Sequence, residues 1–131
     1  MGKLDDMVAK LKYDDKGLIP AVIVDCKTKQ VLMVAYMNAN ALLDTIKTGK
    51  THFWSRSRNK YWMKGESSGH TQQVKAIYTD CDVDTLVIEV EQIGAACHDG
   101  YYSCFYKHLT AAGDWEVVGQ KLFDPDKVYK K

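Results

Sequence analysis

Apolar residues recur along this chain mainly in short runs and in alternation with polar ones, and both patterns are typical of β-strands. Residues 20–25 and 31–37 are nearly continuous apolar runs, separated by a polar segment whose length suits a hairpin. Residues 73–80 alternate apolar and polar side chains, as expected of a half-buried strand. The strands that these patterns predict are residues 20–25, 31–37, 51–57, 73–80, 85–91 and 115–118.

Two segments have helical spacing instead. Apolar side chains recur at intervals of three and four within residues 5–12, which predicts a short helix. Asn38 is a favoured helix N-cap and Gly49 a favoured C-terminal stop, so residues 39–47 are predicted to form a second helix. Glycine and serine over residues 65–69 indicate a loop.

Strands outnumber helices in this prediction, so the expected fold class is α+β. Most connections are too short for parallel crossovers, which indicates a small, mainly antiparallel β-sheet domain with few helices. A length of 131 residues suits one domain over residues 1–131. We expect its core within residues 17–109 and an exposed C-terminal tail over 124–131. Residues 101–109 fit neither the strand nor the helix pattern clearly.

The composition is that of a globular protein, with 46% apolar and 27% charged residues. A net charge of +1 provides no broad positive field, which disfavours a dedicated nucleic-acid-binding protein. The N-terminal sequence lacks the apolar stretch of a signal peptide, and no segment approaches the roughly 18 apolar residues of a membrane span. We therefore expect a cytoplasmic protein without membrane or nucleic-acid partners. Clustered cysteines there indicate metal binding or catalysis more often than disulfides.

Three cysteines form a candidate metal set. Cys81, Cys97 and Cys104 follow the spacing C-x15-C-x6-C, which lacks the tight first pair of a zinc finger. Three ligands without an evident fourth suit a catalytic zinc, which keeps one position open for water. The spacing alone leaves it equally open that these are buried small apolar residues, and Cys26 is assigned to that class.

A second candidate metal site lies around Cys81. Asp80, Asp82 and Asp84 alternate, and in an extended chain their side chains would share one face, opposite Cys81. Carboxylate oxygens suit Mg²⁺ or Ca²⁺. The alternative is a solvated acidic turn between two strands.

A basic and aromatic segment over residues 51–72 is the candidate substrate-binding region. It contains both arginines of the chain, Arg56 and Arg58, whose planar guanidinium groups match phosphate geometry. The candidate substrate-binding residues are Trp54, Arg56, Arg58, Lys64, Ser68 and Gly69. Two other interpretations remain open: an edge strand with exposed charges and core aromatic residues, and a nucleic-acid-binding strand, which the neutral total charge makes the weakest of the three.

The segments FWSRSR, YWMKGESSGHTQ, DCDVDTLVIEVEQ and GAACHDGYYSCF occur in this order within residues 17–109. In combination they resemble the signature of the phosphoribosyl-AMP cyclohydrolases of histidine biosynthesis, in their stand-alone form. One departure is Asp99, where that family usually has threonine. The resemblance implies a hydrolase that opens the adenine ring of N1-(5-phosphoribosyl)-AMP at the N1–C6 bond.

The resemblance also implies the cofactors and the assembly. Cys81, Cys97 and Cys104 match the zinc ligands of the family, and Asp80, Asp82 and Asp84 match its Mg²⁺ ligands. The family is a homodimer in which zinc is bound across the two subunits, so we expect a homodimer with shared zinc ligands. Zinc-activated water would add to C6 of the ring.

Ring opening also needs a proton on the departing N1. His98, beside Cys97, is the first candidate for this transfer and His70 the second, because an unperturbed histidine titrates near neutral pH. His98 could instead only orient the site. His52 and His108 are expected to be structural or peripheral.

Three other functional classes make different predictions for this sequence. A structural zinc module that binds nucleotide without chemistry predicts a closed site with four ligands, the fourth being Cys26 or a histidine. A nucleobase deaminase is disfavoured because the chain lacks both the H-x-E and the P-C-x-x-C motif. An interaction domain held by a disulfide is disfavoured by the expected reducing compartment.

Overall fold

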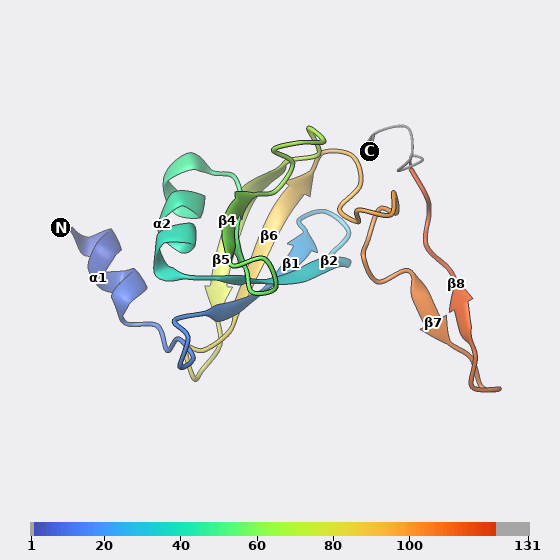
Figure 1. The fold of residues 1–131 in the computed structure, drawn as a ribbon, viewed down its shortest axis with the longest axis horizontal. Coiled ribbons are helices and arrows are strands. Elements are labelled where there is room, and N and C mark those ends of the chain that lie inside the picture. The colour runs from blue at the N-terminus through green and yellow to red at the C-terminus, as the bar shows by residue number, and fades with distance from the viewer. Residues whose placement is uncertain (1, 123–131) are drawn as a thin grey trace.

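The computed structural model describes residues 2–122, and the predicted tail at 124–131 lies outside the described residues. The elements are α1 (Lys3–Ala9), β1 (Ile19–Asp25), β2 (Val31–Met37), α2 (Ala39–Thr48), β3 (His52–Ser55), β4 (Lys60–Met63), β5 (Gln72–Thr79), β6 (Leu86–Gln92), β7 (Lys107–Leu109) and β8 (Trp115–Val117). In Figure 1, both helices lie to the left of the central sheet, and the β7–β8 hairpin extends away at the lower right. The α+β class with few helices is confirmed.

The central sheet has four strands in the order β2-β1-β6-β5. The β1–β2 and β5–β6 pairs are antiparallel, as are the separate β3–β4 and β7–β8 hairpins. The mainly antiparallel character is therefore confirmed. The β1–β6 pair is parallel, with Val22 opposite Val87. The argument from short connections did not anticipate this pair because its two strands are separated by all the elements from β2 to β5.

Helix α2 begins and ends where its capping residues predict. The Ala41 N–H donates to the Asn38 side chain at 2.8 Å, and Gly49 closes the helix with a φ of 76°. Helix α1 is shifted toward the N-terminus relative to the predicted residues 5–12. Its expected last turn leaves the helix because the Lys12 N–H donates to the carbonyl of Val83 at 2.7 Å, in the β5–β6 turn.

The core joins alternating residues of the sheet to α2 and to the β3–β4 hairpin. Side chains on one face of β1 and β6 are fully buried, and Leu42 and Phe53 complete the same cluster. Other buried members are Val8, Ile19, Ala21, Ile23, Leu32, Met33, Met37, Ala41, Leu86, Ile88, Val90 and Ala96. This core fixes the sheet and the hairpin as one unit, so it positions the loops at both ends of β6.

Two hairpins differ from the predicted pattern. The predicted strand over residues 51–57 ends at Ser55, and a second strand, β4, follows after a turn in which Asn59 has a φ of 51°. In residues 101–109 only β7 is regular, and it pairs with β8. Among the described residues, no helix is long and apolar enough to cross a membrane.

Candidate active site

The loop after β6 brings two of the three candidate zinc cysteines together. Cys97 and Cys104 lie within residues 93–106, and their thiols share a hydrogen bond. The Cys97 N–H donates to the Tyr101 carbonyl at 3.1 Å, and the Gly100 N–H donates to the Cys97 carbonyl at 3.0 Å. The chain thus turns tightly after Cys97, and Gly100 takes up the left-handed conformation that the turn requires, with a φ of 96°.

The second half of this loop is fixed to the β1–β2 hairpin. The Cys104 N–H donates to the Leu32 carbonyl at 2.7 Å, and the Tyr102 hydroxyl donates to the Asp25 carboxylate. Burial opposes ionisation of Asp25, but hydrogen bonds from Tyr102 and from two backbone N–H groups outweigh it and lower the pKa of this carboxyl. Burial and then the hydrogen bond to Asp25 raise the pKa of Tyr102.

The surroundings of the two thiols fit a zinc ion. Cys104 is exposed as a residue, but desolvation of its thiol by the surrounding chain raises its pKa to about 12, and the neighbouring Cys97 adds to this increase. A bound cation reverses this preference, because cysteine binds metal as the thiolate. The Asp99 N–H donates to Cys97 Sγ at 3.4 Å, and such donors stabilise sulfur that carries negative charge. The donor set therefore suits zinc, with Cys97 and Cys104 as two of its ligands.

Cys81 lies at the other end of the sheet. It belongs to the turn between β5 and β6, whereas Cys97 follows the end of β6. Strand β6 has seven residues, and at about 3.3 Å each it spans about 23 Å. The three sulfurs of a single chain do not converge: within residues 2–122, the only group of three or more histidine, cysteine or acidic ligand atoms is the aspartate trio.

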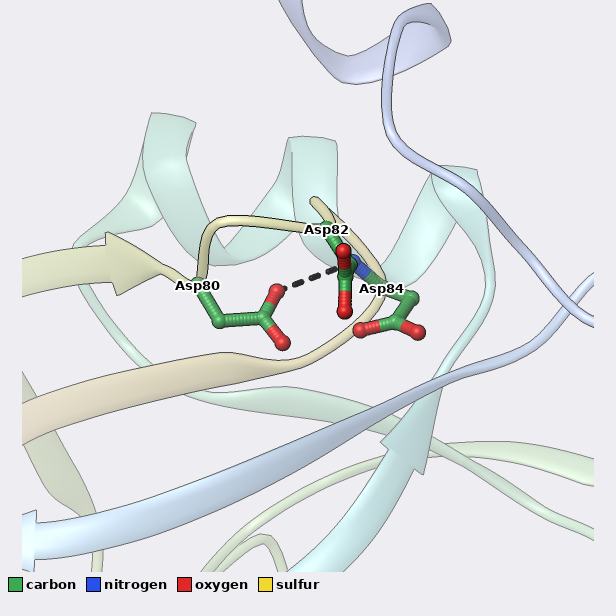
Figure 2. Close-up of side chains that lie close together, drawn as sticks. All are labelled: Asp80, Asp82 and Asp84. Atoms are coloured by element: carbon green, nitrogen blue, oxygen red, sulfur yellow. Dashed lines mark hydrogen bonds between the residues drawn. The ribbon is translucent and has the colours of Figure 1, made fainter.

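The aspartate trio comprises Asp80, Asp82 and Asp84, whose carboxylate oxygens all lie within 4.8 Å of one another (Figure 2). The expectation that an extended chain brings them together is wrong, and so is the expected placement of Cys81 on an opposite strand face. The segment is a tight turn in which Val83 has a φ of 53° and the Asp84 N–H donates to Asp80 Oδ1 at 3.1 Å. The turn converges the carboxylates more closely than a strand would.

The charges of the aspartate trio act on one another. Hydrogen bonds from the Asp84 N–H and side chain outweigh partial desolvation and lower the pKa of Asp80. The shared hydrogen bond with Asp80, followed by desolvation and the charges of Asp80 and Asp82, raises the pKa of Asp84. One proton shared between two carboxylates relieves their repulsion, and a divalent cation would relieve it in the same way.

A groove of about 460 Å³ lies between the β3–β4 hairpin, the following loop and the residue after Cys97. Four of the predicted site residues line it: Arg58, Lys64, Ser68 and His98. His98 is exposed at the tip of the turn that begins at Cys97. The groove thus combines cationic groups with a histidine that directly follows Cys97 in the sequence.

The structure does not bring the other predicted residues into this groove. The Arg56 guanidinium lies 4.0 Å from the centre of the Tyr36 ring, stacked against β2. Trp54 and Gly69 are not among the lining residues. The imidazole of His70 lies against Gly94 instead: a Cβ at that glycine would come within 2.7 Å of Cδ2 of the ring.

The other lining residues all belong to the predicted substrate-binding region 51–72, although they were not among its selected candidates: Ser55, Lys60, Trp62, Met63, Gly65, Glu66 and Ser67. The alternation of Lys60, Trp62 and Lys64 was a usable signal, because side chains two apart in a strand share one face. It was missed because residues 60–63 were not predicted to be a strand. Trp62 also packs on Phe53, with ring centroids 5.0 Å apart, so the core fixes one side of this wall.

The remaining histidines occupy other environments. His52 is buried, its Nδ1 is hydrogen bonded to the Lys50 carbonyl at 2.8 Å, and its ring stacks on Tyr61 at 5.7 Å. These contacts suit the structural role expected for it. His108 is exposed on β7, away from the groove.

Lys64 joins the groove to the cysteine loop. Its side chain is buried, and Nζ donates to the carbonyl of Ala96 at 2.5 Å. Burial lowers the pKa of this ammonium, whereas the negative charges of Cys104 and Cys97 act in the opposite direction. The ammonium therefore binds the segment that carries Cys97, while Lys64 also lines the groove.

Known proteins are similar in sequence to this chain along most of its length. A model of the family described as phosphoribosyl-AMP cyclohydrolase matches residues 33–106. The phosphoribosyl-AMP cyclohydrolase of Pelotomaculum thermopropionicum is 57% identical over 92% of this chain and 94% of that protein. The Methanosarcina barkeri enzyme of the same name is 59% identical over 88% of this chain and 87% of its own length.

A longer relative matches over only part of its length. The histidine biosynthesis bifunctional protein HisIE of Thermoanaerobacter pseudethanolicus is 50% identical over 97% of this chain and 58% of that protein. The similarity therefore covers most of the length of the two phosphoribosyl-AMP cyclohydrolases, but only part of the bifunctional protein. Together with the motifs and the groove, these matches establish that the chain belongs to the phosphoribosyl-AMP cyclohydrolase family.

Proposed function

We propose that this chain is the phosphoribosyl-AMP cyclohydrolase of histidine biosynthesis, opening the adenine ring of N1-(5-phosphoribosyl)-AMP by hydrolysis of the N1–C6 bond. The observation that carries the proposal is the groove, which joins Arg58 and Lys60 to His98, the residue next to the buried thiol of Cys97. The identity of 57% over nearly the whole of a relative with this name supports the same reaction.

The reaction adds the oxygen of water to C6 and breaks the C6–N1 bond, whose electron pair goes to N1 together with a proton. Zinc held by the cysteines would supply hydroxide at neutral pH by lowering the pKa of its bound water to about 7. His98 is assigned the proton transfer to N1, since it is exposed in the groove and follows a zinc ligand. His70 is less suited, because its ring packs against Gly94 outside the groove.

Other groove residues suit binding of the substrate. Arg58 and Lys60 project cationic groups that match phosphate, and Arg offers two parallel donors to it. Trp62 provides an aromatic face on which the purine would stack. Mg²⁺ at Asp80, Asp82 and Asp84 is proposed to be the second cofactor, since convergent carboxylates are its preferred ligands.

The zinc site is proposed to form between two copies of the chain. Cys97 and Cys104 from one subunit would join Cys81 from the other, because about 23 Å of β6 separates these positions within a chain. The β7–β8 hairpin supports a homodimer. It begins shortly after Cys104 and exposes apolar side chains that a partner would cover, including Trp115, which is 67% exposed in the single chain.

The test pairs metal analysis with an ultraviolet assay of ring opening on N1-(5-phosphoribosyl)-AMP. We expect the purified chain to contain zinc and to open the ring, and Cys97→Ala to lose both. Cys26→Ala is the matched control, because Cys26 lies half-buried in the turn between β1 and β2, does not line the groove, and should leave zinc content and activity unchanged. A zinc-containing protein without ring opening, or an active Cys97→Ala variant without zinc, would refute the proposal.

A further inference from the structure

Lys64 is an unusual residue for the wall of a substrate groove, because its charge is buried. Within residues 2–122 it is the only buried lysine, arginine, aspartate or glutamate, with 9% of its surface exposed. An ammonium group loses its hydration when it is buried, so it is stable there only if nearby groups replace the water.

The groups that replace water around Lys64 belong to the cysteine loop. Nζ donates to the Ala96 carbonyl at 2.5 Å, which satisfies one of its three donors. No carboxylate of the described residues forms a salt bridge with it. Cys104 and Cys97 are the groups whose ionisation would favour its charged form. A buried cation that lies beside two thiols, and that has no salt bridge to a carboxylate among residues 2–122, is suited to a site where those thiols become thiolates.

The backbone around Lys64 holds its side chain in this direction. The Lys64 N–H donates to the Thr51 carbonyl at 3.1 Å, at the end of the β3–β4 hairpin. Gly65 follows with a φ of 86°, and a Cβ there would lie 2.6 Å from the backbone of His70, so the chain bends sharply. On the other side, the Ala96 N–H donates to the Tyr102 carbonyl at 3.1 Å. The Lys64–Ala96 bond therefore connects two constrained segments.

We infer that Lys64 is a positioning residue of the zinc site: its buried ammonium balances the charge of the cysteine thiolates and holds the segment that carries Cys97. Three thiolates and one Zn²⁺ sum to a net charge of −1, which one ammonium neutralises. This inference rests on the proposed function, and it changes the role first expected for Lys64. The substrate phosphates are left to Arg58 and Lys60, the other cationic residues of the groove.

The test measures zinc affinity by competition with a chromogenic chelator in Lys64→Gln, Lys64→Met and Lys64→Arg variants. Lys64→Gln retains an N–H donor without the charge, and Lys64→Met removes both. We expect both variants to bind zinc about 10-fold to 100-fold more weakly, the range typical of partners that support metal ligands. Lys64→Arg should recover most of the affinity. Lys60→Met, in the same groove wall, is the matched control and should bind zinc like the unaltered chain.

A second measurement separates this role from a general loss of structure. With Co²⁺ in place of zinc, the thiolate-to-cobalt absorption band should shift in Lys64→Gln, while the far-ultraviolet circular dichroism stays that of the unaltered chain. If Lys64→Gln keeps its zinc affinity and cobalt spectrum but shows a higher KM, Lys64 binds substrate and the inference is wrong. If the unaltered chain binds zinc without opening the ring, the proposed reaction fails while the role of Lys64 is still tested. If the unaltered chain binds no zinc, both fail.

Discussion

Replacing Tyr102 by phenylalanine would remove one hydroxyl and test how the cysteine loop is held on the sheet. That hydroxyl donates to the Asp25 carboxylate, and it links the loop carrying Cys97 and Cys104 to the end of β1. Hydrogen bonds to charged groups contribute about 1.5–3 kcal/mol. Both residues are half-buried, so water can partly replace the lost donor. We therefore expect Tyr102→Phe to lower the free energy of unfolding by about 1.5 kcal/mol.

The effect should depend on pH. The pKa of Asp25 is lower in the folded than in the unfolded chain, so its contribution is complete above about pH 4 and is lost as the pH falls through the folded value. The pKa of Tyr102 is raised, so its contribution is complete below about pH 10 and is lost as the pH rises through the folded value. The difference between Tyr102→Phe and the unaltered chain should be largest between these limits.

Urea unfolding followed by circular dichroism measures this difference. With a slope of about 1.5 kcal/mol per molar urea, the loss corresponds to a midpoint lower by about 1 M at pH 7. Tyr78→Phe is the matched control, because Tyr78 is 55% exposed on β5, and its midpoint should not change. Equal midpoints for Tyr102→Phe and the unaltered chain at pH 7 would show that this hydrogen bond does not stabilise the fold.

Three further results are expected. Asn38→Ala should lower the free energy of unfolding by about 1 kcal/mol in urea, because the Ala41 N–H loses its capping acceptor. Trp115→Glu, on the exposed hairpin, should convert dimer to monomer in sedimentation velocity and reduce zinc content; a zinc-loaded dimer would exclude the hairpin from the interface. His98→Ala should reduce kcat by about 100-fold to 10,000-fold with zinc retained. If most of kcat remains, another group transfers the proton.

Local signals predicted much of the fold. The apolar run over 31–37 matches β2, and Asn38 and Gly49 bound α2, because a cap or a short run is decided by neighbouring residues. The parallel β1–β6 pair is decided by contacts far apart in the sequence, which no local pattern encodes. Strand β4 was missed because residues 51–72 were interpreted as one substrate-binding region, although Asn59 is a suitable turn residue.

The candidate site was predicted to a similar extent. The convergence of Asp80, Asp82 and Asp84 was anticipated, but by the wrong geometry, since the left-handed residue Val83 closes a turn that alternation does not reveal. The groove includes Arg58 and His98, two of the candidate residues. The burial of Lys64 was not foreseen, because a lysine in a basic segment has the same sequence pattern whether it faces solvent or two thiols.

The placement of Cys81 and Cys97 at opposite ends of β6 has a genetic consequence. In the proposed two-fold dimer, each chain contributes Cys81 to one zinc site and Cys97 to the other. A mixed dimer of one Cys81→Ala chain and one Cys97→Ala chain would carry both lesions in one site and none in the other. Two alleles that are inactive alone would thus restore activity together, because the mixed dimer keeps one intact zinc site. Each gene encodes a single chain, but each active site needs two chains.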